Sequence, residues 1–165
     1  MQKWATFATV AGGAAAALTG LLFVAVSIRI EVIAKSQELR NRAAQTLSLF
    51  VTALLVTILL SIPDQSDRLL GVEIVALAVM TGVIQLLLDR RARADADERD
   101  ASAHFLASVL DSVAPNGATS SLLLVAGLLL VFRVDAGLDV LIVPVLVALA
   151  GGVISAWLLL TKIPT

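Results

Sequence analysis

The chain of 165 residues contains no cysteine and only one histidine, His104. Without cysteine it has no disulfides, no thiolate metal ligands and no cysteine nucleophile. A single histidine excludes a metal site built from several imidazoles, and no hydrolase, zinc-protease or phosphate-loop motif occurs. We therefore expect no enzyme activity, no catalytic residues, no metal site and no cofactor.

Charge is also scarce, because charged residues make up 15% of the chain and hydrophobic residues 59%. Soluble domains carry about 25% charged and roughly 45–50% apolar residues. The formal net charge of −1 provides no basic field that would attract nucleic acid. The composition predicts a chain whose partner is the lipid bilayer and which has no nucleic-acid partner.

Long apolar runs are what the sequence has in abundance, and a helix needs about 20 such residues to span a bilayer. The five runs predicted to span cover residues 6–28, 43–62, 69–88, 118–134 and 138–160. The first run exceeds the roughly 7–15 residues of a signal peptide's apolar region, so we expect a retained helix. The fourth is short and contains Arg133, so four spans are the alternative. The predicted fold is all-α, a polytopic transmembrane helical bundle in a single membrane domain.

Lysine and arginine are divided unequally between the two sides of this bundle, and cytoplasmic loops keep the excess. With five spans, one side holds three basic residues, Lys3, Arg68 and Arg133. The other side holds nine, Arg29, Lys35, Arg40, Arg42, Arg90, Arg91, Arg93, Arg99 and Lys162. We expect the N-terminus outside the cell and the C-terminus in the cytoplasm.

A charged and amphipathic segment, residues 89–117, separates the third and fourth spans. Opposite charges in 89–100 recur four residues apart, a spacing that pairs them along a solvated helix. Residues 101–114 place apolar side chains on one helical face and polar ones on the other. We expect a cytoplasmic amphipathic helix there, followed by a turn at residues 115–117.

Small residues recur in the first and fifth spans, some of them four residues apart. Those predicted to pack helices are Gly12, Gly13, Ala16, Gly20, Gly151 and Gly152. Small side chains let helix backbones approach closely in lipid, where van der Waals contact stabilises association. We expect close helix packing within or between subunits, and a homo-oligomer.

The third span carries a polar stripe formed by Glu73, Thr81, Gln85 and Asp89. A carboxylate inside a membrane is costly and usually faces protein or water. Three interpretations of Glu73 stay open: an interfacial carboxylate in headgroup water, an ion- or proton-handling group, or a member of an interhelical hydrogen-bond seam. The partners expected for its carboxylate are Arg68, Thr57 and Ser61.

Residues 7–28 read FATVAGGAAAALTGLLFVAVSI, residues 42–47 read RAAQTL and residues 70–74 read LGVEI. Together they resemble a family of short, uncharacterised bacterial integral membrane proteins, frequent in actinobacteria, some of whose members are labelled modulator of FtsH protease. The likeness covers mainly residues 7–74. It implies a multi-pass protein of the bacterial cytoplasmic (inner) membrane with a non-enzymatic role, and it supplies no catalytic residues.

Two functions are consistent with these features. The first is an ion or small-solute channel or transporter, in which several copies align the polar stripe around a path. The alternative is an accessory or regulatory role, in which the cytoplasmic helix docks a membrane protein partner such as a protease or transporter. A defined ring would favour transport, whereas a monomer that copurifies with a large partner would favour the accessory role.

Overall fold

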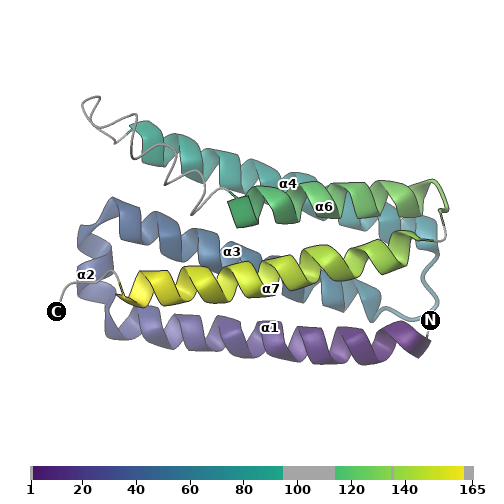
Figure 1. Ribbon diagram of the computed structural model, residues 1–165, viewed down its shortest axis with the longest axis horizontal. Coiled ribbons are helices and arrows are strands. Elements are labelled where there is room, and N and C mark those ends of the chain that lie inside the picture. Colours follow the sequence, from purple (N-terminus) through teal and green to yellow (C-terminus); the bar gives the residue numbers. More distant parts are fainter. Residues whose placement is uncertain (1, 95–113, 135, 162–165) are drawn as a thin grey trace.

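The computed structural model describes residues 2–94, 114–134 and 136–161, and these form six α-helices in an elongated bundle (Figure 1). The helices are α1 (Gln2–Ile28), α2 (Ile30–Lys35), α3 (Gln37–Leu60), α4 (Asp67–Ala94), α6 (Ala114–Val131) and α7 (Gly137–Thr161). The prediction of an all-α fold is confirmed. Most of the segment predicted to hold a cytoplasmic amphipathic helix lies outside the described residues.

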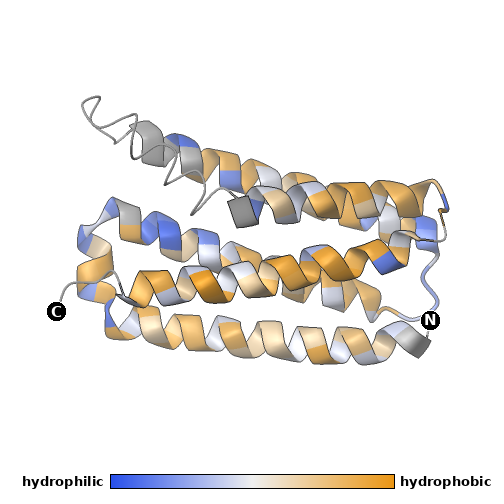
Figure 2. Ribbon diagram, viewed as in Figure 1, coloured by the Kyte–Doolittle hydropathy of each residue, from blue (hydrophilic) through white to orange (hydrophobic). Residues whose placement is uncertain are grey.

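Four of these helices, α1, α3, α4 and α7, are long and apolar enough to cross a membrane, and α6 contributes a shorter apolar helix, Asn116–Val131. Figure 2 shows apolar residues along the helices and hydrophilic ones towards their ends. Large apolar side chains face outwards, among them Phe132 at 75% and Trp157 at 68% exposure. Such extensive apolar surface suits lipid and not water. The chain is a multi-pass helical membrane protein.

The long helices run up and down along one axis, with α3 packed against α1, α4 and α7, and with α6 packed against α4 and α7. The start of α1, the α3–α4 turn and the α6–α7 turn lie together at what we call the N-terminal end of the bundle (Figure 1). The opposite end, which we call the α2 end, holds α2 and the end of α7. The core between the helices includes Ala15, Val56, Ile74, Ala126 and Leu141.

Helices α3 and α4 extend beyond the predicted spans. The helix α3 begins at Gln37, ahead of the predicted residue 43, and α4 continues past residue 88 to Ala94, into the segment where the sequence analysis expected a solvated helix. The side chain of Ser36 caps α3 by accepting a hydrogen bond from the backbone N–H of Leu39 at 3.4 Å. Hydropathy marks where the hydrocarbon ends, whereas a helix continues into polar surroundings while its backbone stays bonded. The helix α2 was not predicted, because it lies in the polar link between two spans, where hydropathy does not indicate a helix.

The predicted turn at residues 115–117 is wrong, because these residues form the first turn of α6. Proline fits at the start of a helix, where its missing N–H would have no partner within the helix and its fixed φ is already helical. Pro115 therefore starts this helix where the sequence analysis expected a turn.

Arg133 lies beyond the end of α6, not within the span as the sequence analysis expected. Its φ of 58° is left-handed, and its backbone N–H donates to the carbonyl of Leu130 at 3.0 Å. The next N–H, of Val134, donates to the carbonyl of Leu129 at 2.9 Å. This pair of bonds closes a helix C-terminus. The exposed guanidinium of Arg133 consequently sits in the α6–α7 turn.

The backbones of α4 and α6 approach each other closely at Gly71 and Gly127. A Cβ atom at Gly71 would lie 2.7 Å from the backbone nitrogen of Val131 and 2.9 Å from the carbonyl oxygen of Gly127. A Cβ at Gly127 would lie 3.0 Å from the backbone nitrogen of Val75. Backbone atoms cannot turn aside as a side chain can, so both positions require glycine. The sequence analysis had singled out neither residue.

Replacing Gly71 or Gly127 by alanine should therefore lower stability by about 1–3 kcal/mol, the usual cost of overpacking. Gly82→Ala on α4 is the matched control, since its Cβ would meet nothing closer than the Cβ of Ser120 at 4.0 Å. Unfolding of the three variants in one mild detergent measures the difference. Equal stability for all three would contradict the close approach of the two backbones.

Candidate functional site

The carboxylate of Glu73 is half-buried near the start of α4 and accepts a hydrogen bond from the side-chain amide of Gln65 at 2.5 Å. Gln65 is a buried residue of the α3–α4 turn. Two of the expected partners are engaged elsewhere as donors, because Thr57 donates to the carbonyl of Leu54 and Ser61 to that of Thr57. The turn thus supplies an amide partner that the sequence analysis did not consider.

Gln85 links α4 to α6 through both ends of its amide. Its Nε2 donates to the Oδ1 of Asn116 at 3.2 Å, and its Oε1 accepts from the Oγ of Ser120 at 3.1 Å. Gln85 is only 7% exposed, so the two bonds satisfy an amide that would be costly to bury alone. Asn116 and Ser120 are four residues apart on one face of α6. Sequence reasoning missed them because it placed Asn116 in a turn.

The remaining stripe residues do not converge on one site. Thr81 is buried and donates to two carbonyls of its own helix, those of Leu77 at 2.9 Å and Ala78 at 3.1 Å. Asp89 lies within α4, but its side chain is outside the described part of the chain. The stripe therefore divides into a carboxylate bonded to the turn, a hydroxyl bonded to its own helix and an amide bonded to α6.

The first turns of α3 add a further set of buried polar side chains, Asn41, Gln45 and Thr46. Asn41 is 8% exposed, and its Nδ2 has no hydrogen-bond partner among the described residues. Thr46 donates to the carbonyl of Arg42 at 2.9 Å. An unsatisfied buried amide nitrogen costs about 1–3 kcal/mol, so burial of Asn41 lowers the stability of the fold.

The predicted packing residues divide into two groups. Gly12 faces α3, where an added Cβ would lie 2.8 Å from the Oγ1 of Thr57, and a Cβ at Gly152 would meet the ring of Phe50. Within the described part of the chain, nothing lies within 4 Å of such an atom at Gly13 or Gly20. Ala16 is exposed and Gly151 is half-buried. The first group packs helices within the chain, and Gly13, Ala16 and Gly20 face outwards.

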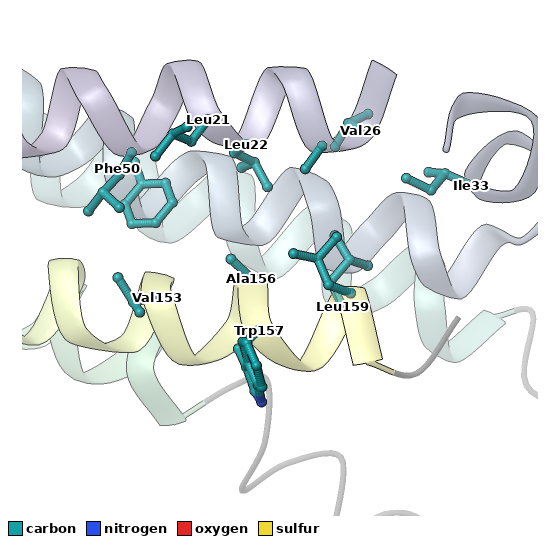
Figure 3. A pocket seen from close by; sticks show the side chains of 12 residues that line it. Leu21, Leu22, Val26, Ile33, Phe50, Val153, Ala156, Trp157 and Leu159 are labelled. Atoms are coloured by element: carbon teal, nitrogen blue, oxygen red, sulfur yellow. The ribbon is translucent and has the colours of Figure 1, made fainter. Parts of the chain in front are cut away.

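An apolar recess of about 200 Å³ lies between α1 and α7 at the α2 end of the bundle (Figure 3). Its walls include Leu22 of α1, Ile33 of α2, Phe50 of α3, and Ala156 and Trp157 of α7. Sequence reasoning did not find it, because it is formed by helices that are distant in sequence and whose apolar residues look like ordinary span residues.

Among the residues that the structure describes, no group of three or more histidine, aspartate and glutamate side chains could hold a metal ion. His104 is outside them. The described residues can form buried hydrogen bonds and apolar contacts. No protein-family model, no curated protein and no solved structure matches this chain.

The Gln85 bridge predicts an energetic coupling between α4 and α6. Ser120→Ala should lower the free energy of unfolding more in the wild-type chain than in a Gln85→Leu background. The difference should be about 0.6 kcal/mol and at most about 1.7 kcal/mol, the average and the maximum for interhelical hydrogen bonds in lipid. Ser121→Ala is the matched control, because the hydroxyl of Ser121 donates to the carbonyl of Ala118 in its own helix. Detergent unfolding of the double-mutant cycle measures the coupling. A coupling no larger than that of the Ser121 control would contradict the bridge.

Proposed function

We propose that this chain is a non-catalytic accessory protein of a bacterial inner membrane that acts by associating with other helices in the bilayer. The observation that carries the proposal is the outer face of α1. This helix packs mainly against α3. On its other side it presents Gly13, Ala16 and Gly20, small residues that let a further helix approach closely.

We further propose five spans, with the N-terminus outside and the C-terminus in the cytoplasm. Two observations support α6 as the fourth span. It packs along α4 and α7, and its 18 residues extend about 27 Å, close to the roughly 30 Å of a hydrocarbon core. Arg133 no longer has to lie inside the span. The N-terminal end of the bundle then holds Arg68 and Arg133, and most of the basic residues lie at the α2 end, which faces the cytoplasm.

Self-association or partner binding through α1 can be separated from packing within the chain. Gly20→Leu should leave thermal stability unchanged, because the added side chain has open space. It should, however, abolish formation of the oligomer or copurification of the partner. Gly12→Leu should instead lower stability, because it collides with Thr57. Val24→Leu is the control, an exposed position on α1 that already carries a large side chain.

Size-exclusion chromatography with light scattering, in one mild detergent, measures the outcome for all three variants. An assembly that survives Gly20→Leu unchanged would contradict association through this face. So would a wild-type chain that is monomeric and free of partners.

We propose a membrane protease or transporter as the class of partner. The support is the resemblance of residues 7–74 to proteins labelled modulator of FtsH protease. The cytoplasmic segment 89–117 would add a second contact, although residues 95–113 lie outside the described chain. Crosslinking in native membranes tests this, since a partner captured by wild type and lost from Gly20→Leu supports docking through α1.

Transport through the polar stripe is the second candidate function. It is favoured by Thr81 and Gln85, polar side chains that are buried within the third span, Gln85 being bonded to polar residues of α6. If the stripe lines a path, Glu73→Gln should alter proton or cation flux in reconstituted vesicles and leave assembly intact. If Glu73 is structural, the same substitution should only lower thermal stability, because Gln65 loses a charged acceptor. Wild-type flux no higher than the leak of empty vesicles, at both low and neutral pH, would rule out transport.

A further inference from the structure

The recess between α1 and α7 is open on the side that faces lipid. Both helices pack on α3 and make few contacts with each other, so Phe50 of α3 forms the floor between them. Leu22 and Leu159 are buried with Phe50 and close the inner side. Leu21 and Trp157, on opposite walls, are largely exposed (Figure 3). A chain-like molecule can therefore enter from the bilayer.

The lining determines what can occupy this space. Its side chains are aliphatic or aromatic, so they favour apolar groups and offer almost nothing to a polar ligand. At about 200 Å³ the recess is smaller than the roughly 300–1,000 Å³ of sites for drug-sized molecules. It suits a segment of one acyl chain better than a whole compact ligand.

Helix α2 brings positive charge to the end of the recess. Ile33 is buried and lines it, while Arg29 directly before α2 and Lys35 in its last turn are exposed. The guanidinium of Arg40 donates to the carbonyl of Ala34 at 3.3 Å, which holds a third cation against α2. Acidic residues are fewer here, since residues 29–42 contain four basic side chains and two acidic ones, Glu31 and Glu38.

We propose that this recess binds an anionic phospholipid, with one acyl chain between α1 and α7 and the phosphate beside Arg29, Lys35 and Arg40. The charge complementarity argues for this occupant, because each lysine or arginine near a membrane surface favours anionic lipid. Trp157 fits the same arrangement, since tryptophan is enriched where acyl chains meet headgroups. The proposal goes beyond association through α1, because it requires no second protein.

Tryptophan fluorescence gives a direct test, because the chain has only two tryptophans. In a Trp4→Phe background, Trp157 alone reports on the recess. Phosphatidylglycerol brominated on its acyl chain should quench Trp157 at a lower mole fraction in detergent micelles than brominated phosphatidylcholine does. Arg29→Gln or Lys35→Gln should each weaken this preference by about fivefold. Arg68→Gln, at the opposite end of the bundle, should leave it unchanged.

Filling the recess should abolish the preference for phosphatidylglycerol over phosphatidylcholine without removing any charge. Ala156→Phe fills it from α7 and Ala25→Phe fills it from α1, so either variant serves if the other does not fold. Val79→Phe on the exposed face of α4 is the control and should retain the preference. Equal quenching of the parent Trp157 chain by the two brominated lipids would overturn the proposal. A preference that persists in a folded, recess-filled variant would overturn it as well.

Discussion

The contact between the backbones of α4 and α6 sets the position of much of the rest of the structure. At Gly71 and Gly127 these helices are close enough that an added methyl group would collide with main-chain atoms. Because they are held this closely, Asn116 and Ser120 of α6 come within hydrogen-bonding distance of Gln85. The same packing places the end of α6 at the N-terminal end of the bundle, from which α7 returns along α3.

Hydrogen bonding inside the bilayer imposes the second constraint, since lipid offers no partners to a polar group. Glu73 and Gln85 are bonded to other parts of the chain, and Thr81 to its own helix. The described side chains of the stripe are thus engaged in hydrogen bonds within the chain, and Gln85 among them joins two helices. This supports the proposed association role more than transport, and among the described residues the outer face of α1 and the recess between α1 and α7 are surfaces available for binding.

Much of the helical architecture could be predicted from sequence, because apolar runs of about 20 residues directly reflect bilayer thickness. The prediction failed at the ends of helices and where two helices contact each other. Pro115 and Asn116 suggest a turn locally but begin α6, and Arg133 was assigned to a span although a left-handed backbone places it in a turn. Gly71 and Gly127 were missed because each is isolated in its own helix. Only their pairing across two helices gives them a role, and one sequence does not display pairings.

Labelling can test whether α6 crosses the membrane, which would give the chain the five spans proposed for it. Because the chain has no cysteine, single cysteines at Ser66, Ala136 and Lys35 can be labelled in intact cells with a reagent that does not cross the membrane. With five spans, we expect labelling from outside at Ser66 and Ala136 and protection at Lys35. Protection of Ala136 while Ser66 is labelled would show that α6 does not cross the membrane and would contradict five spans.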